Sequence, residues 1–70
     1  MRLTDVVAEN LRTLRVRKKL TQELLANKAG VSVSYISMLE RGNRAPPLDT
    51  LETLANALGV TPLALLEKRR

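Results

Sequence analysis

Residues 21–41 read TQELLANKAGVSVSYISMLER, and this segment predicts two short helices, 22–29 and 33–41, joined by a tight turn. Gly30 stands directly after the first helix, where glycine readily adopts the left-handed conformation that ends helices. Ala26 is small and lies midway along that helix, so the two backbones can approach closely. A turn this short holds the helices at a steep angle, and the second helix is expected to project from the body of the domain.

Three further helices are predicted on either side of this pair. Before it, Thr4-Asp5 can cap a helix over 4–18, in which apolar residues recur at i, i+4 and i+7. After it, Pro46-Pro47 marks a loop, which is followed by a helix over 48–58 with an apolar stripe. A proline at its first position predicts a short last helix over 62–66. No segment has the alternation typical of a strand, so the expected fold class is all-α.

The composition bounds the class of protein. Seventy residues suffice for one small core, so we expect a single domain over 1–70. Hydrophobic residues make up 44% of the chain, and Tyr35 is the only aromatic residue. Because cysteine and histidine are both absent, neither a disulfide nor a structural zinc site is expected, and we predict no metal and no cofactor. The longest aliphatic run, 63–66, is far shorter than the roughly 20 apolar residues that span a bilayer. We therefore expect a soluble cytoplasmic protein with no membrane partner.

The net charge indicates the class of partner. The chain carries +5, which favours a polyanion. Residues 1–30 hold seven bases and three acids, net +4, and residues 31–45 add net +1. Residues 46–67 hold three acids and no base, whereas residues 68–70 are all basic. One end of the domain is thus expected to be basic and the other mildly acidic. The alternative is ordinary surface charge that keeps a small protein soluble.

Motif residues spread over residues 7–66 resemble the Cro/CI-type (Xre-type) helix-turn-helix family, the DNA-binding domain of lambdoid phage repressors and many bacterial regulators. The matching segments are Thr21-Gln22-Glu23, Leu25-Ala26, Ala29-Gly30-Val31-Ser32, Tyr35-Ile36-Ser37, Glu40-Arg41-Gly42, Pro46, Leu48 to Leu51 and Ala57-Leu58-Gly59-Val60. The resemblance implies a compact five-helix, lambda-repressor-like bundle with its motif at 21–41. It also implies a sequence-specific transcriptional regulator of the repressor type, which docks helix 33–41 in the major groove of double-stranded DNA, usually as a homodimer on an inverted repeat.

The resemblance also implies which residues form the site. Positions that match the family's contacts to the DNA backbone are Thr21, Gln22, Ser32, Tyr35, Asn43 and Arg44. Positions that match its base readers are Val33, Ser34 and Met38, with Ser37 able to touch a base edge or the backbone. Arg15 and Glu40 match a pair that forms a buried salt bridge between the first and third helices. The alternative is that these are two exposed charges.

Two of the base-reading positions depart from the family pattern, in which Gln, Asn or Arg is common. Val33 and Met38 cannot form bidentate hydrogen bonds, although Val33 can contact a thymine methyl group. Discrimination by direct hydrogen bonds is therefore expected to be modest, with selectivity coming from DNA shape or from Arg44 near a groove wall. The alternative is that the two apolar side chains shield the edge of the core.

Apolar residues at expected surface positions raise two further hypotheses. The last helix lies near the two-fold axis in the phage repressors, so Leu63 and Leu66 are candidates for a small, weak dimer interface. The bundle could instead be a protein-interaction module, such as an antitoxin-like or co-regulator domain in which DNA binding is secondary. Leu24, Leu63, Val33 and Met38 slightly favour that second function.

Catalysis is not expected from this sequence. It offers no histidine or cysteine for proton transfer or nucleophilic attack, no glycine-rich phosphate loop and no clustered pair of carboxylates. The glutamates on separate predicted helices face outward: Glu9, Glu23, Glu52 and Glu67. We therefore predict that the protein is not an enzyme, and that this chain binds no small-molecule ligand.

Overall fold

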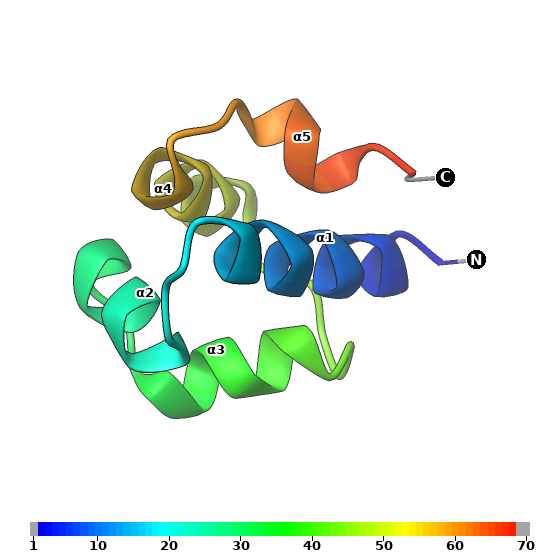
Figure 1. Ribbon diagram of the computed structural model, residues 1–70. Helices are drawn as coiled ribbons and strands as arrows, with labels where there is room; N and C mark the ends of the chain where they lie inside the picture. Colours follow the sequence, from blue (N-terminus) through cyan, green and yellow to red (C-terminus); the bar gives the residue numbers. More distant parts are fainter. Residues whose placement is uncertain (1, 69–70) are drawn as a thin grey trace.

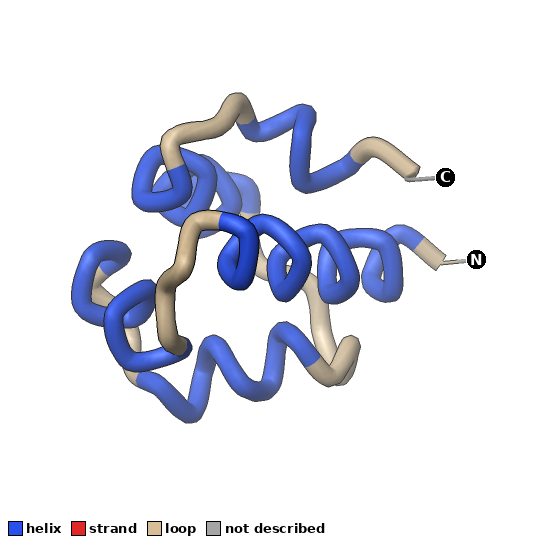
Figure 2. The backbone as a smooth tube through the Cα atoms, viewed as in Figure 1, coloured by secondary structure: helices blue, strands red, loops and turns tan. Residues whose placement is uncertain are grey.

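The computed structural model describes residues 2–68, which form five α-helices and contain no strand (Figures 1 and 2). In chain order the helices are α1 Leu3–Arg17, α2 Gln22–Ala29, α3 Val33–Glu40, α4 Leu48–Leu58 and α5 Pro62–Leu66. The predicted all-α class is confirmed. Three helices have the predicted bounds, whereas α1 is shifted by one residue toward the N-terminus and α3 ends one residue early. Met1 and Arg69-Arg70, which belong to the predicted domain 1–70, lie outside the described residues.

The start of α1 differs from the prediction that Thr4-Asp5 would cap it. The N-cap residue is Arg2, and Asp5 lies inside the first turn. The extended backbone of Arg2 lets its carbonyl oxygen accept hydrogen bonds from the amides of Asp5 at 3.0 Å and Val6 at 3.1 Å. Asp5 still supports the helix start, because the positive end of the helix dipole favours a carboxylate there. Its carboxylate also lies 3.5 Å from the Arg2 guanidinium.

The ends of α2 and α3 follow the predicted cap chemistry. The Thr21 hydroxyl oxygen accepts a hydrogen bond from the Leu24 amide at 3.0 Å. The Ser32 hydroxyl oxygen accepts one from the Tyr35 amide at 3.1 Å. Gly30, with φ at 72°, ends α2 in the left-handed conformation that glycine adopts at little cost. These local signals fix both helix starts within a three-residue connection and so determine how α3 leaves α2.

Helix α1 runs through the middle of the bundle, with α3 on one side and α5 on the other (Figure 1). Helix α2 packs against α3 and α4, and α4 packs against α5, so the apolar faces of all five helices meet in one core. The largest apolar side chains that are fully buried come from every helix: Leu11, Leu25, Ile36, Leu39, Leu54 and Leu65. Because this core is aliphatic, its contribution to stability is mainly nondirectional hydrophobic burial.

Two polar side chains of the described residues are buried, Asn10 of α1 and Glu40 of α3, and Asn10 is the more deeply buried. Its Nδ2 donates hydrogen bonds to the carbonyl oxygens of Leu65 at 3.0 Å and Glu67 at 2.7 Å. Carbonyl groups at the end of a helix have no partner within the helix, so a side-chain donor from elsewhere satisfies them. Asn10 therefore fastens the short helix α5 to α1 across most of the chain length.

Candidate nucleic-acid interface

Helix α3 packs against the bundle through a narrow side formed by Ile36, Leu39 and Glu40. The predicted base readers lie on the remaining surface, either exposed or half-buried: Val33, Ser34, Ser37 and Met38. Val33 is 40% exposed, and Met38, although half-buried, is not one of the partly buried apolar residues of the described chain that pack against the core cluster. This placement weighs against the alternative that they shield the core, and it leaves a helix with an accessible outer face.

The residues predicted to contact the DNA backbone lie around the starts of α2 and α3 and just beyond the end of α3. Those that are exposed are Thr21, Ser32, Asn43 and Arg44, and those that are half-buried are Gln22 and Tyr35. The hydroxyl oxygens of Thr21 and Ser32 accept their cap hydrogen bonds, which leaves each O–H group available as a donor. Tyr35 differs from the others because its ring packs against the core.

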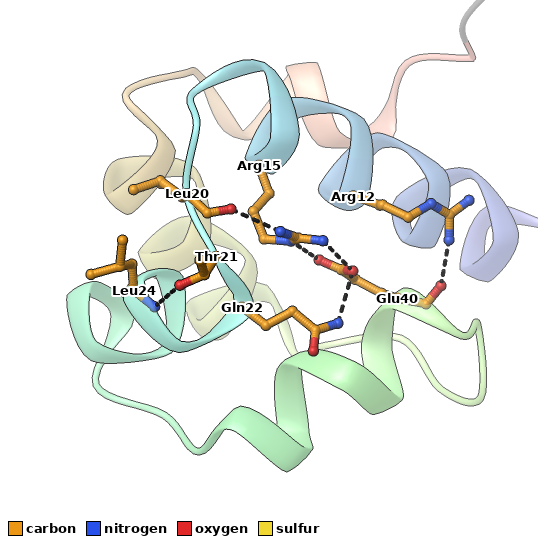
Figure 3. Close-up of polar contacts among 7 residues, drawn as sticks. All are labelled: Arg12, Arg15, Leu20, Thr21, Gln22, Leu24 and Glu40. Atoms are coloured by element: carbon orange, nitrogen blue, oxygen red, sulfur yellow. Dashed lines mark hydrogen bonds and ion pairs between the residues drawn. The ribbon is translucent and has the colours of Figure 1, made fainter.

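The buried side of α3 carries one charge, the Glu40 carboxylate, and Arg15 of α1 pairs with it (Figure 3). Arg15 Nε donates to Glu40 Oε2 at 2.6 Å and Arg15 Nη2 donates to Glu40 Oε1 at 3.2 Å. The two side chains are only 14% and 5% exposed. Arg15 Nη1 also donates to the Leu20 carbonyl oxygen at 2.8 Å. The structure thus forms the buried ion pair between α1 and α3, and ties the α1–α2 loop to it.

Gln22, the first residue of α2, also points toward Glu40 (Figure 3). Its Nε2 donates to Glu40 Oε1 at 3.1 Å. The sequence indicates Gln22 only as a phosphate contact. In the structure one of its two amide hydrogens is committed to Glu40, and the other hydrogen and the carbonyl oxygen remain for another partner. Glu40 therefore connects the start of α2 with both α1 and α3.

Arg12 of α1 is a further member of this cluster, and no role is predicted for it from the sequence. Its Nη1 donates to the backbone carbonyl oxygen of Glu40 at 3.1 Å (Figure 3). A cation there is favourable because the last carbonyl groups of a helix carry the negative end of its dipole. The position of Arg12 could have been predicted from its spacing, since Arg12 and Arg15 are three residues apart on one face of a helix. Every buried side-chain nitrogen and oxygen in the described chain has a hydrogen-bond partner, so this charged cluster is fully satisfied.

Exposed basic side chains flank α3 and precede α2. Arg41 and Arg44 follow α3, whereas Lys18 and Lys19 lie in the loop before α2. The acidic residues of 46–67 lie on other elements, with Asp49 and Glu52 on α4 and Glu67 just after α5. These three acids are therefore separated from the four bases named here, although Glu23 is an exposed acid on α2 and Lys68 an exposed base after α5.

Arg41 also contacts α3 itself, through a hydrogen bond that is not predicted from the sequence. Its Nη1 donates to the Ser37 hydroxyl oxygen at 2.9 Å, and Arg41 is exposed. The face on which Arg41 lies could be predicted from periodicity, because residues 34 and 41 are seven apart and fall on the same face of a helix. The outer face of α3 thus includes a guanidinium group.

The surface formed by α3 and the starts of α2 and α3 is suited to binding a partner by means of a helix. In residues 2–68 the structure has no pocket, and no group of three or more His, Cys, Asp or Glu that could hold a metal ion. No helix in that range is long and apolar enough to cross a bilayer. What the surface does present is hydroxyl and amide donors at two helix starts, together with nearby positive charge, and these groups suit a polyanion such as a phosphate backbone.

Sequence comparison places this architecture among known proteins. A sequence profile of the helix-turn-helix family matches residues 11–65, which include α2, α3 and most of the core. The chain belongs to the Cro/CI-type helix-turn-helix family. It is 44% identical over 66 residues to an uncharacterized HTH-type transcriptional regulator from Sinorhizobium fredii, covering 94% of this chain and 86% of that protein.

Two other relatives of this helix-turn-helix chain are informative. The immunity repressor protein of Bacillus phage phi105 is 42% identical over 60 residues, which cover 86% of this chain and 42% of the repressor. This chain therefore spans less than half of that relative. The crystal structure of a hypothetical transcription factor from Neisseria matches with a TM-score of 0.91 and 39% identity, covering 96% of this chain and 77% of the other.

The family membership confirms the predicted resemblance and the five-helix fold. In Cro/CI-type terms, α2 and α3 are the helix-turn-helix pair, and proteins of this family bind double-stranded DNA. The family and the relatives named above are DNA-binding regulators, so the prediction that this chain is not an enzyme is confirmed as well.

Proposed function

We propose that this chain is a sequence-specific regulator of transcription, of the repressor type, which acts as a single domain in the cytoplasm and inserts α3 into the major groove of double-stranded DNA. The observation that carries the proposal is the outer face of α3, which is accessible and bears no acidic side chain, since its one carboxylate is buried and paired. The major groove is about 12 Å wide and admits one helix. Relatives named as transcriptional regulators support the same function.

Contacts to phosphates set the register of the helix in this proposal. The O–H groups of Thr21 and Ser32 donate to phosphate oxygens while their oxygens keep capping α2 and α3. Gln22 uses its remaining amide hydrogen in the same way, from a position that Glu40 holds. Asn43 and Arg44, both exposed beyond α3, grip the backbone of the same half-site, and Tyr35 adds a contact from the start of α3.

Contacts to base edges give the sequence preference. Val33 packs against a thymine methyl group, and Met38 provides a second apolar contact further along the helix. Ser34 and Ser37 each offer one hydroxyl to a base edge or a neighbouring phosphate. Single hydroxyl bonds discriminate less than bidentate ones, so the shape of the DNA supplies part of the selectivity.

A second copy of the chain completes the proposed regulator on an inverted repeat. Leu63 of α5 is 66% exposed, which suits a residue that a partner copy covers. Leu66 is half-buried and packs partly against the core, so it adds less area. With one exposed leucine the dimer is weak, and DNA with two half-sites roughly 34 Å apart strengthens it. Sedimentation that remains monomeric at high protein concentration, both with and without DNA, would contradict this part of the proposal.

Ser34→Glu tests the DNA-binding function directly. A carboxylate near the start of the outer face of α3 would meet the negative potential of the groove, so we expect binding to be abolished while the helical circular dichroism is retained. Asn56→Glu is the matched control, because Asn56 is exposed on α4 and the charge change is the same. Fluorescence anisotropy with labelled DNA at several salt concentrations measures both variants. If Ser34→Glu binds as tightly as the original protein, α3 is not at the interface.

A protein-interaction module is the second candidate function. The observation that favours it is Leu24, which is 49% exposed on α2 beside the proposed DNA surface. A gel shift with mixed genomic DNA at low salt separates the two functions, since a regulator binds nonspecifically under those conditions. Absence of a shift, together with capture of a cognate protein that Leu24→Ser abolishes, would favour the second candidate.

A further inference from the structure

The accessible side of α3 is organised around a line that joins Ser34 to Arg41. These residues are seven apart, which is close to two full turns of a helix, and both are exposed. Ser37 and Met38 lie between them on the same side, half-buried. Arg41 therefore lies at the C-terminal end of the face that the proposed function turns toward the bases.

The Arg41 side chain reaches back over this face. Side chains on a helix lean toward its N-terminus and cover the preceding turn. The hydrogen bond from Arg41 Nη1 to Ser37 Oγ, at 2.9 Å, places the guanidinium over that turn. Among residues 2–68 no carboxylate forms an ion pair with Arg41. Of the five N–H donors of a guanidinium, one is used by Ser37, and the others are available to a ligand.

The rest of this face lacks a group that can read one base through two hydrogen bonds. Val33 and Met38 offer none, and each serine offers a single hydroxyl. A guanidinium is a planar fork whose two parallel N–H groups match the O6 and N7 acceptors of guanine in the major groove. Arg44 lies beyond the helix and is not held on this face, which leaves Arg41 as the candidate for base recognition.

We propose that Arg41 reads a guanine in each half-site, and that Ser37 positions its guanidinium for this contact. The inference rests on the proposed function, because it requires α3 to lie in the major groove. It adds a hydrogen-bonding base reader at the end of α3, in place of the bidentate readers that positions 33 and 38 do not provide. A phosphate contact by Arg41 is the competing role, and it makes a different prediction about sequence preference.

The test is selection of bound sites from a random pool of double-stranded DNA by the original chain, Arg41→Ala and Arg41→Lys. Lys68→Ala serves as the control, because it also removes one exposed positive charge but follows α5, the helix that lies across α1 from α3. We expect the original chain and the control to select sites with a guanine at one fixed position of each half-site. Arg41→Ala should lose the preference at that position alone.

Affinities for the selected site and for a site with that guanine replaced give the magnitude. We expect Arg41→Ala to bind the selected site about 5- to 150-fold more weakly, as for loss of one bidentate base contact. Its binding to the replaced site should be nearly unchanged. Arg41→Lys keeps the charge but loses the planar fork, so its guanine preference should be weaker than that of the original chain.

Several results would overturn the inference. Equal weakening of binding to both sites by Arg41→Ala, with a salt dependence reduced by about one phosphate contact, would show a backbone role. Survival of every base preference in Arg41→Ala would remove Arg41 from recognition and leave the proposed function intact. Selection of no shared sequence by the original chain would overturn the inference and the sequence-specific function together. If Arg41→Ala lost its helical signal, the Arg41→Lys comparison with the same two sites would decide between the roles.

Discussion

Replacing Glu40 by leucine tests whether the buried ion pair holds α3 in place. Leucine has a similar volume but no charge, so the substitution leaves the Arg15 guanidinium facing an apolar side chain. The three donors that point at the carboxylate, Arg15 Nε, Arg15 Nη2 and Gln22 Nε2, lose their acceptor. The hydrogen bond from Arg12 to the Glu40 backbone carbonyl oxygen can still form, because it does not use the Glu40 side chain.

The expected loss of stability follows from the burial of the partner that remains. Breaking a buried pair by removing one member costs about 3–5 kcal/mol, because an uncompensated charge is left inside. Arg15 keeps some contact with water, since its side chain is 14% exposed, and it keeps its bond to Leu20 at 2.8 Å. Both features favour the lower end, about 3 kcal/mol. A domain of this size is stable by roughly 4–10 kcal/mol in total, so Glu40→Leu should remove a large share.

Urea denaturation followed by circular dichroism measures this loss, and the double variant Arg15→Met/Glu40→Leu is the matched control. Removing both charges leaves neither unpaired, so the double variant should recover most of the stability of the original chain. Thermal midpoints should follow, with Glu40→Leu lower by about 12–24 °C. A loss below about 1 kcal/mol for Glu40→Leu, which is typical of an exposed pair, would refute the reasoning. So would a double variant no more stable than Glu40→Leu.

Two further substitutions probe local features of the fold. Asn10→Leu leaves the carbonyl oxygens of Leu65 and Glu67 without their side-chain donor. We therefore expect the free energy of unfolding in urea to fall by about 1–3 kcal/mol, and amide hydrogen exchange to become faster in α5 than in α2. Unchanged exchange in α5 would contradict the role of Asn10. Gly30→Ala places a Cβ where nothing lies within 4 Å, so its cost is the left-handed backbone alone, about 1–2 kcal/mol in the same measurement. Gly30→Asn should cost less because asparagine tolerates that conformation, and equal losses for the two would show that the cost is not conformational.

The sequence predicts best those parts of the fold in which particular residues start or end a helix. Thr21 and Gly30 bound α2, Pro62 and Gly59 bound the last loop, and the helices there begin and end as predicted. The start of α1 was predicted wrongly because Thr4-Asp5 has good capping chemistry. The observed cap, Arg2, contributes only its backbone and so leaves no side-chain signal.

The polar contacts between distant residues are the parts that spacing cannot predict. Asn10 falls on the apolar stripe of α1, so its burial could be predicted from the sequence. The carbonyl oxygens that accept its hydrogen bonds lie more than fifty residues away and could not. The pairing of Arg15 with Glu40 came from family resemblance and not from any local pattern, and the bond from Gln22 to the same carboxylate came from neither. Arg41 could be placed on the outer face of α3 by periodicity, whereas its contact with Ser37 depends on which way the side chain turns.

The ion pair also has a functional consequence that its effect on stability does not explain. Apolar packing tolerates small rotations, because hydrophobic contacts have no required direction. A rotation of α3 by one residue would move its outer face through about 100°, turning Ser34 and Arg41 away from a groove. The hydrogen bonds to Glu40 come from α1 and α2 and have fixed directions, so they restrict this rotation in a way that leucines cannot. The double variant Arg15→Met/Glu40→Leu should therefore stay folded and yet bind DNA more weakly than the original chain, and undiminished binding would show that the aliphatic core alone orients α3.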